Sequence, residues 1–322
     1  MLPFHRAAVA LKKAASVAVC AHVRPDGDAV GSVLGMTLAL RAAGIPAVPT
    51  LADDLPAPST YSFLPGHSLY VPVRDIEPPE VFVALDTPVP DRLGAARGLM
   101  ESAGTVVVID HHPDSVQYGA ISICGSQFAA TGQIVWQSLP ALEVRPTDEV
   151  ALALYVALMT DTGRFSYDNT SPEALRDAAA MIEAGADPSY AARMVYQERS
   201  AASLDLEARA LARLTPANGG RVSWTYLTDA DFEETNALPE EAEHVVDAVR
   251  ALGGVDVVVL LRQRGSEVRG NLRSKRGADI AVVARALGGG GHRAAAGFTV
   301  EDATIPDVME RLLPMLPGGV SA

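Results

Sequence analysis

The chain has little cysteine, few aromatic residues and no long hydrophobic run. Its 322 residues include two cysteines, Cys20 and Cys124, which lack metal-ligand spacing and are too few for a disulfide framework. No apolar run approaches the roughly 20 residues that span a bilayer. Lys12 and Lys13 interrupt the apolar N-terminal segment, which predicts a short amphipathic helix leading into a strand and not a signal peptide. Together these absences predict a cytoplasmic protein with no membrane segment.

Positive charge is scarce overall but concentrated in one segment. A net charge of −13 excludes a protein that coats long nucleic acid, because that role needs a broad basic surface. Residues 262–293 nevertheless contain eight basic and two acidic residues, so this window carries +6 and the remainder −19. A locally basic segment in an acidic chain favours a small anionic substrate held in one pocket.

The first half alternates apolar strands with helical segments. The predicted strands are Ser16–Ala21, Ala47–Leu51, Val81–Leu85, Thr105–Ile109 and Ala120–Ile123. The predicted helices are Ala29–Ala43, Thr131–Leu139 and Asp148–Met159, with Thr147 as a helix N-cap and Ser171 as the cap of the next helix. Near-continuous apolar strands separated by helices indicate a doubly wound, mainly parallel α/β sheet covered on both faces.

The second half predicts a smaller α/β domain. From about Pro172 to Leu214 the pattern is helical, and the turn-forming TPANGG at 215–220 marks a boundary. Strands are then expected at 221–227, 255–261, 267–272 and 298–300, and helices at 239–251, 278–287 and 306–313. We therefore expect a first domain over 1–185, a helical connector over 186–214 and a second domain over 215–322.

Aspartate and histidine residues follow apolar segments four times. His22, Asp26 and Asp28 follow SVAVCA, Asp86 closes VFVAL, Asp110, His111 and His112 close TVVVI, and Asp161 follows ALALYVALM. In an open α/β sheet, ligands bind beyond the carboxyl ends of the strands. Carboxylate and imidazole ligands without thiolate favour Mn²⁺ or Mg²⁺ over structural zinc.

Each of these residues also has a plainer interpretation. A single aspartate after a strand is usually a turn or a helix cap, and a lone histidine is more often a core or surface residue than a ligand. The coincidence favours metal binding, because three of only seven histidines lie beside carboxylates at strand ends. Two ions about 3.5–4 Å apart can clamp a phosphoryl group and lower the pKa of a bridging water from about 15.7 toward 7.

The motifs resemble those of the DHH phosphoesterase superfamily, whose name is spelled by residues 110–112. The matching segments are HVRPDGDAVGS at 22–32, LDT at 85–87 and TDTGRF at 160–165. The resemblance implies one ion held by His22, Asp26 and Asp86, and a second held by Asp28, Asp86, His111 and Asp161. It also implies catalytic roles for Asp86, which bridges the ions, and for His112, which serves the leaving oxygen, while Asp110 orients an imidazole.

A second constellation lies in the basic segment, at GNLRSK (270–275) and GGGGHRAAAGF (288–298). A flexible linker and a solvated basic face are the plain alternatives. We instead expect the glycines to admit an anion, with His292 and Arg293 opening a helix at AAAGF. The segment resembles the DHH-associated substrate domain, which implies that Arg273, Ser274, Gly290, Gly291 and His292 grip the terminal phosphate of a nucleotide.

The resemblance predicts an enzyme whose active site lies in the cleft between the two domains. We expect it to use two Mn²⁺ ions, with Mg²⁺ or Co²⁺ as substitutes, to generate the hydroxide that attacks phosphate. The expected substrates are oligoribonucleotides of two to five residues and 3′-phosphoadenosine 5′-phosphate (pAp), from which the 3′-phosphate is removed. The alternatives are a linear or cyclic dinucleotide phosphodiesterase, a RecJ-like single-strand exonuclease, a pyrophosphatase or polyphosphatase, and a non-catalytic nucleotide-binding module. The sequence leaves base preference, polarity of attack and a homodimer open.

Overall fold

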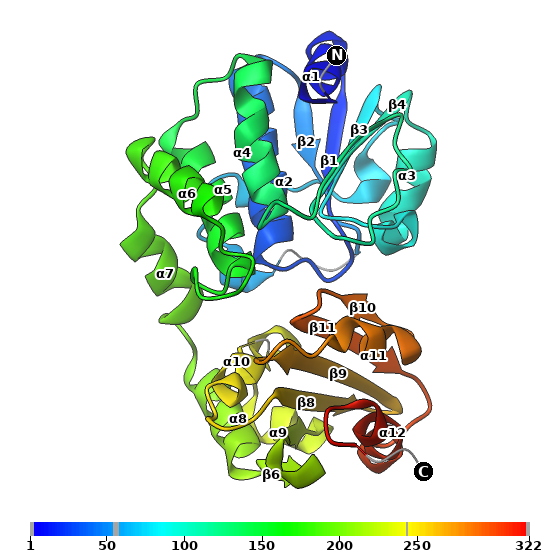
Figure 1. The fold of residues 1–322 in the computed structure, drawn as a ribbon. Helices are drawn as coiled ribbons and strands as arrows, with labels where there is room; N and C mark the ends of the chain where they lie inside the picture. Colours follow the sequence, from blue (N-terminus) through cyan, green and yellow to red (C-terminus); the bar gives the residue numbers. More distant parts are fainter. Residues whose placement is uncertain (1–2, 54–57, 243, 320–322) are drawn as a thin grey trace. The chain divides into compact units, whose positions relative to one another are not determined.

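The structure is a computed structural model that describes residues 3–53, 58–242 and 244–319. It divides into two compact units, Met1–Glu198 and Arg199–Ala322, each with its own sheet and core (Figure 1). The division lies within the segment expected as a connector, whose helices α7 (Pro188–Tyr196) and α8 (Ala201–Ala212) belong to different units. A separate connector domain stays a prediction.

The first unit contains the parallel sheet that the apolar strands predict. Its strand order among the described residues is β2-β1-β3-β4-β5, and every neighbouring pair is parallel. The strands are β1 (Val17–Cys20), β2 (Ala47–Pro49), β3 (Val81–Leu85), β4 (Thr105–Asp110) and β5 (Ile121–Cys124). The α/β fold class is therefore confirmed, with each strand displaced by two residues or fewer from its predicted bounds.

Helices cover both faces of this sheet because both faces are apolar (Figure 1). Along β1, Val17 and Val19 belong to one core cluster, and Ala18 and Cys20 belong to the other. The first cluster packs against α1 (Pro3–Lys13), α2 (Gly27–Ala42), α4 (Thr131–Leu142) and α5 (Asp148–Asp161). The second packs against α3 (Arg97–Glu101). None of the helices in the described part is both long and apolar enough to cross a membrane.

Local capping starts several of the helices where the sequence predicts. The Thr147 hydroxyl accepts a hydrogen bond from the Val150 N–H at the start of α5. The Ser171 hydroxyl caps α6 (Pro172–Glu183) in the same way. Asp161 is the last residue of α5, so this candidate ligand comes from a helix end and not from a strand end.

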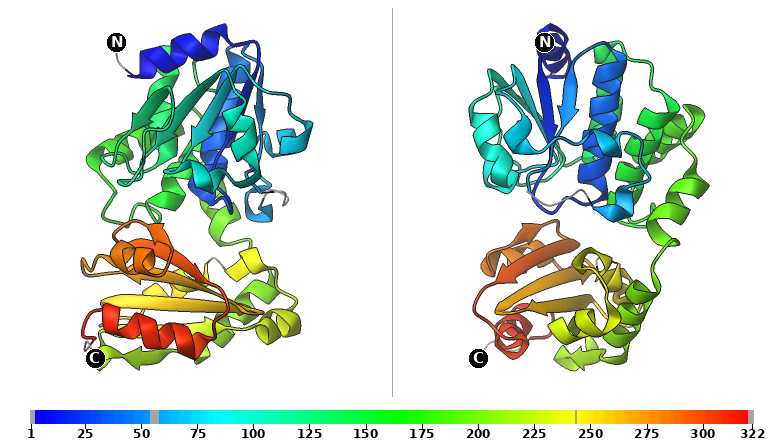
Figure 2. Two further views of the ribbon diagram at one scale, coloured as in Figure 1. Left: turned by 90° about the vertical axis from the view of Figure 1, so that its right-hand side faces the viewer. Right: turned by 180° about the vertical axis from the view of Figure 1, so that it is seen from behind.

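The second unit contains a mixed sheet, which confirms a second α/β unit. Its order is β10-β11-β9-β8-β7-β6 in the described residues, with β7 and β8 parallel and the other pairs antiparallel. The strands are β6 (Thr215–Ala217), β7 (Val222–Leu227), β8 (Val257–Arg264), β9 (Glu267–Ser274), β10 (Gly290–Gly291) and β11 (Ala295–Val300). One face packs against α8, α9 (Asp229–Thr235) and α10 (Val245–Arg250). The other packs against α11 (Ile280–Ala286) and α12 (Ile305–Leu312) (Figure 2).

Two helix predictions in this unit are corrected. The helix expected at 239–251 is a short 3-10 turn, Pro239–Ala242, followed by α10. The helix expected at AAAGF is wrong, because Ala295–Val300 form strand β11 and pair with β9. His292 and Arg293 therefore lie in the tight connection between β10 and β11, and Arg293 donates a hydrogen bond to the Gly277 carbonyl oxygen.

Candidate metal centre

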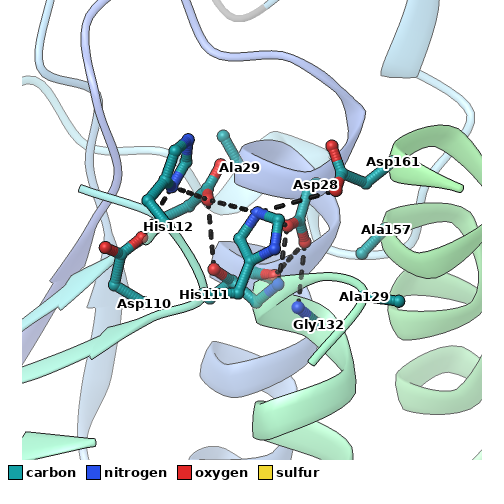
Figure 3. A network of polar contacts seen from close by, with 12 residues as sticks. Asp28, Ala29, Asp110, His111, His112, Ala129, Gly132, Ala157 and Asp161 are labelled. Carbon is teal, nitrogen blue, oxygen red and sulfur yellow. Dashed lines mark hydrogen bonds and ion pairs between the residues drawn. The ribbon is translucent and has the colours of Figure 1, made fainter. Parts of the chain in front are cut away.

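The residues predicted as metal ligands come together at the carboxyl edge of the first sheet. His111 Nε2 lies 3.6 Å from one carboxylate oxygen of each of three residues, namely Asp28, Asp86 and Asp161. Figure 3 shows the His111 imidazole between His112 on one side and Asp28 and Asp161 on the other. The four residues of this group come from four separate segments that lie far apart in the sequence.

A second group of ligand atoms lies around His22. Its Nε2 is 3.4 Å from Asp86 Oδ2 and 4.0 Å from Asp26 Oδ1. The other ring nitrogen, Nδ1, is 2.8 Å from the Val23 carbonyl oxygen and donates to it, which leaves the Nε2 lone pair directed at the carboxylates. Asp26 also caps α2 by accepting from the Ala29 N–H, so the capping interpretation and the ligand interpretation both fit this side chain.

Asp86 faces both groups. Its Oδ2 is the atom near His22, and its Oδ1 is the atom near His111. The residue adopts a left-handed backbone conformation with φ of 52°, which is uncommon for a non-glycine residue and is found at functional sites. It is 2% exposed, and the Thr131 hydroxyl donates to its Oδ1 over 3.1 Å. One carboxylate is thus held between two sets of nitrogen and oxygen atoms.

Asp28 is held by the N-terminus of a helix. Its carboxylate accepts from the Thr131 N–H at 2.6 Å and from the Ser32 hydroxyl at 2.9 Å. It also accepts from the Gly132 N–H at 2.9 Å (Figure 3). Thr131 and Gly132 begin α4, where backbone N–H groups have no partner within the helix and favour negative charge. The three donors fix the orientation of the side chain with an oxygen directed at His111.

The geometry fits divalent cations. Ligand atoms about 2.1 Å from one cation and at right angles to each other lie about 3 Å apart. The observed nitrogen–oxygen separations of 3.4–3.6 Å are too long for hydrogen bonds but suit atoms that surround a small ion. Within the described residues, two such groups are His22–Asp26–Asp86 and Asp28–Asp86–His111, whose candidate ligand atoms lie within 4.8 Å of one another.

Burial and neighbouring charges strongly shift the pKa values of three carboxylates in these groups. Burial, reinforced by the nearby charges of Asp86 and Asp161, raises the pKa of Asp28 well above its usual range. Burial also raises the pKa of Asp161 to about 6. For Asp86 burial acts in the same direction, but contact with His22 and the charges of neighbouring imidazoles outweigh it, so its pKa lies well below the usual range. A divalent cation would favour the ionised form of all three carboxylates.

Asp110 and His112 form a buried pair beside these groups. His112 Nδ1 is 2.9 Å from Asp110 Oδ1 and donates to it, and the same nitrogen is 3.4 Å from Asp86 Oδ1. Burial lowers the pKa of His112, but the hydrogen bond to Asp110 and the surrounding negative charge raise it to about 9 overall. Asp110 is fully buried, so its carboxylate fixes the ring and stabilises the protonated imidazole.

Several residues that position the site carry no recognisable signal in the sequence. Thr131 and Gly132 open α4 and hold Asp28, and the Asn169 side chain donates to the Asp161 backbone carbonyl oxygen. The glycines at 27, 31 and 35 are spaced by four on α2, and a Cβ at any of them would overlap α5. A spacing of four residues predicts that the glycines share a helix face adapted to close packing, but the sequence does not identify the helix that packs there.

The second unit holds the other predicted site residues. Arg273 Nε and Ser274 Oγ are buried and have no hydrogen-bond partner within the described residues. Ser274 is the last residue of β9, so both side chains lie at the end of this strand, and Arg273 Nε is 3.8 Å from Asp247 Oδ1. The glycine run is not a linker, because Gly290 and Gly291 form β10 and a Cβ at Gly289 would overlap the β11 backbone. His292 follows β10 directly, in the connection to β11.

Comparison with known proteins identifies the family. The model of the DHH family, N-terminal domain, matches residues 16–158, and the DHHA1 domain matches residues 222–316. The bifunctional oligoribonuclease and PAP phosphatase NrnA of Thermus thermophilus is 33% identical over 92% of this chain and 87% of its own length. The chain belongs to the DHH family.

Other similarities agree with this membership. The protein of the same name from Bacillus subtilis is 26% identical to this DHH family member, over 87% of both chains. The crystal structure of an exopolyphosphatase-related protein from Bacteroides fragilis superimposes with a TM-score of 0.87, covers 96% of this chain and 94% of its own, and is 21% identical. At that identity the structural likeness establishes the fold alone.

Proposed function

We propose that this DHH family member, a hydrolytic phosphoesterase, cleaves very short oligoribonucleotides to mononucleotides and removes the 3′-phosphate of pAp. The observation that carries the proposal is the pair of ligand groups that share the buried Asp86 carboxylate. The substrates are taken from the relatives in Thermus thermophilus and Bacillus subtilis, whose names state both activities. We also propose that the enzyme acts in the cytoplasm.

The residues assigned to the cations follow the two groups. His22, Asp26 and Asp86 would hold one ion, and Asp28, Asp86, His111 and Asp161 would hold the other. When bound, divalent cations neutralise phosphate charge and lower the pKa of a coordinated water. We propose Mn²⁺ as the physiological metal, with Mg²⁺ or Co²⁺ as substitutes, because the donor set combines carboxylate with imidazole and contains no thiolate.

The chain's own residues supply orientation and a proton. Asp86 is fixed by Thr131, so its two oxygens keep their directions during turnover. His112 uses Nδ1 to bond Asp110, and the proton that it can give to a leaving oxygen is therefore the one on Nε2. The negative charge around His112 favours the protonated ring, which is the form that a general acid requires.

In the second unit, we propose that Arg273, Ser274, Gly290, Gly291 and His292 bind the terminal phosphate of the substrate. The support is the buried Ser274 hydroxyl and the buried Arg273 Nε, neither of which has a hydrogen-bond partner in the part of the chain described, since the Asp247 carboxylate 3.8 Å from Arg273 Nε is too distant for one. A buried donor without a partner costs free energy, which an anionic ligand would recover. Recognition of a terminal phosphate favours short substrates over internal positions of long strands.

A substrate panel with Mn²⁺ tests the proposal. We expect release of mononucleotides from dinucleotides to pentanucleotides and release of phosphate from pAp, with little action on long RNA and on cyclic di-adenylate. His112→Ala should lower kcat strongly, whereas the matched control His5→Ala, at an exposed position of α1, should not. Faster turnover of long single strands or of cyclic di-adenylate would contradict the substrate assignment.

A further inference from the structure

A buried arginine and an asparagine lie on the same face of the second sheet as Arg273. Along β8 and β9, Val258 pairs with Arg273, Leu260 with Asn271 and Arg262 with Arg269. Paired residues of neighbouring strands share a face, and alternate residues of one strand share it too. Arg262, Asn271 and Arg273 therefore lie on one face of the sheet. Arg262 is buried on this face, with 6% of its surface exposed.

The contact between Arg262 and Asn271 fixes which way the asparagine amide points. Arg262 Nη2 donates to Asn271 Oδ1 over 2.8 Å. A guanidinium has donors only, so it must face the carbonyl oxygen of the amide, and the NH₂ group must point away from it. A buried guanidinium thus turns the two N–H donors of Asn271 to the side opposite β8.

That side of Asn271 is lined by glycine. Asn271 pairs with Gly297 of β11, and Gly297 pairs with Gly290 of β10. A Cβ at Gly297 would lie 3.8 Å from Asn271 Nδ2, and a Cβ at Gly290 would meet no atom within 4 Å. The amide donors therefore face two adjacent glycines, which leave space beside Asn271, and Arg273 lies two residues along β9 on the same face.

We propose that Asn271 is a further substrate-binding residue, which donates a hydrogen bond to the terminal phosphate beside Arg273, and that Arg262 is the residue that positions its amide. Alternate residues of a strand lie about 6.6 Å apart, a span that the long Arg273 side chain and one phosphate group can bridge. A neutral amide adds a directed donor without further charge, so it contributes to recognition of the phosphate group. The inference rests on the proposed function of the second unit.

Kinetics with a dinucleotide that carries a 5′-phosphate, pApA, and with its unphosphorylated counterpart ApA test the role of Asn271. Asn271→Asp replaces the donors by a carboxylate, and we expect KM for pApA to rise about 10- to 100-fold with kcat within about twofold of wild type. KM for ApA should not change. Asn271→Ala should raise KM for pApA about tenfold. Gln263→Glu makes the same charge change on the opposite face of β8 and should leave both substrates unaffected.

The role of Arg262 requires a test of coupling. Arg262→Lys keeps the charge but loses the planar donor, and we expect it to raise KM for pApA severalfold while the protein stays folded at the assay temperature. In the Asn271→Ala background the same substitution should have no additional effect, because no amide remains to be oriented. Additive losses would overturn the positioning role.

Ligand binding separates failure of this inference from failure of the proposed function. Calorimetry on the full chain in EDTA compares AMP with adenosine, and their difference measures phosphate recognition without turnover and without cations. We expect Asn271→Asp to abolish most of that difference. If wild type discriminates AMP but cleaves no dinucleotide, the proposed substrate fails and the binding role stands. If Asn271→Asp discriminates as wild type does, or if wild type shows no discrimination, the role of Asn271 is refuted.

Discussion

Gly132 is the position where a single methyl group should disturb the metal centre most directly. It is the second residue of α4, its N–H donates to Asp28 Oδ1 over 2.9 Å, and its α-carbon faces α5. A Cβ at this position would overlap the Cβ of Ala157, and the next nearest atoms would be Ser32 Oγ at 3.3 Å and Asp28 Oδ1 at 3.4 Å. Gly132→Ala therefore forces α4 away from α5 and away from Asp28.

The magnitude follows from the packing. Overpacking by one methyl costs about 1–3 kcal/mol in the free energy of unfolding. For a unit of 198 residues, each kcal/mol lowers the unfolding temperature by about 2–4 °C. The displaced N–H also weakens the support of a candidate ligand, and such losses lower metal affinity by about 10- to 100-fold.

The opposing residue offers a matched rescue. Ala157→Gly removes the methyl from α5 and should cost about 1 kcal/mol, as glycine does in a helix, while it leaves Mn²⁺ affinity near wild type. The double variant Gly132→Ala, Ala157→Gly moves the methyl from one helix to the other at almost constant volume. We expect it to recover metal affinity and to unfold within about 1 kcal/mol of wild type.

Thermal unfolding and Mn²⁺ titration by calorimetry on the four proteins measure both quantities. The contact argument is refuted if Gly132→Ala binds Mn²⁺ as wild type does, or if the double variant is no better than Gly132→Ala alone. Recovery of stability without recovery of metal affinity would show that the N–H of residue 132 does not support Asp28.

Three further predictions concern charge. Asp110→Asn should lower kcat about 10- to 100-fold with little change in Mn²⁺ affinity, because it no longer anchors His112 as an anion; unchanged steady-state kinetics would oppose this. EDTA should lower the unfolding temperature and abolish activity, and added Mn²⁺ should restore both in wild type but not in Asp86→Asn, as scanning calorimetry and activity assays can show. In the second unit, burial raises the pKa of Asp231, but Arg213 and the cap of α9 lower it to about 2 overall. The ionised Asp231 therefore adds about 2 kcal/mol to the free energy of unfolding above pH 4, and this contribution is lost as the pH falls through 2. In chemical unfolding, Asp231→Asn should be less stable than wild type above pH 4 and equally stable near pH 2.

The sequence predicts the strand-borne part of the metal centre well, for a physical reason. Strands β3 and β4 are buried on both faces, so their apolar runs end where the chain reaches the polar edge of the sheet. Asp86 and residues 110–112 stand at those ends, and parallel strands bring their carboxyl ends to one edge. The apolar pattern of the strands and the parallel topology of the sheet therefore predict, without any contact information, that these residues lie near one another.

Short segments of small residues are less predictable. Ala295–Val300 contain alanine and glycine, which carry little signal of helical or strand periodicity, and the segment is a strand because it pairs with β9. The glycines before it suggest a helix N-terminus as readily as a hairpin. Only the close backbone approach at Gly289, where a Cβ would overlap β11, decides between the two. That approach is a tertiary contact and leaves no local pattern.

The part of the metal centre that helices supply is only partly predictable from the sequence. Asp28 lies in the first turn of α2 and Asp161 ends α5, so their distance depends on how closely the two helices pack and not on strand ends. The glycines at 27, 31 and 35 form a stripe without side chains along α2, and this stripe lets α5 approach within backbone contact. Glycines spaced four residues apart indicate close packing on that face of the helix, but they do not identify the helix that packs there. The motif that supplies Asp26 and Asp28 thus also contains the packing surface that brings Asp161 to them, and only the folded chain shows that these two functions share one segment.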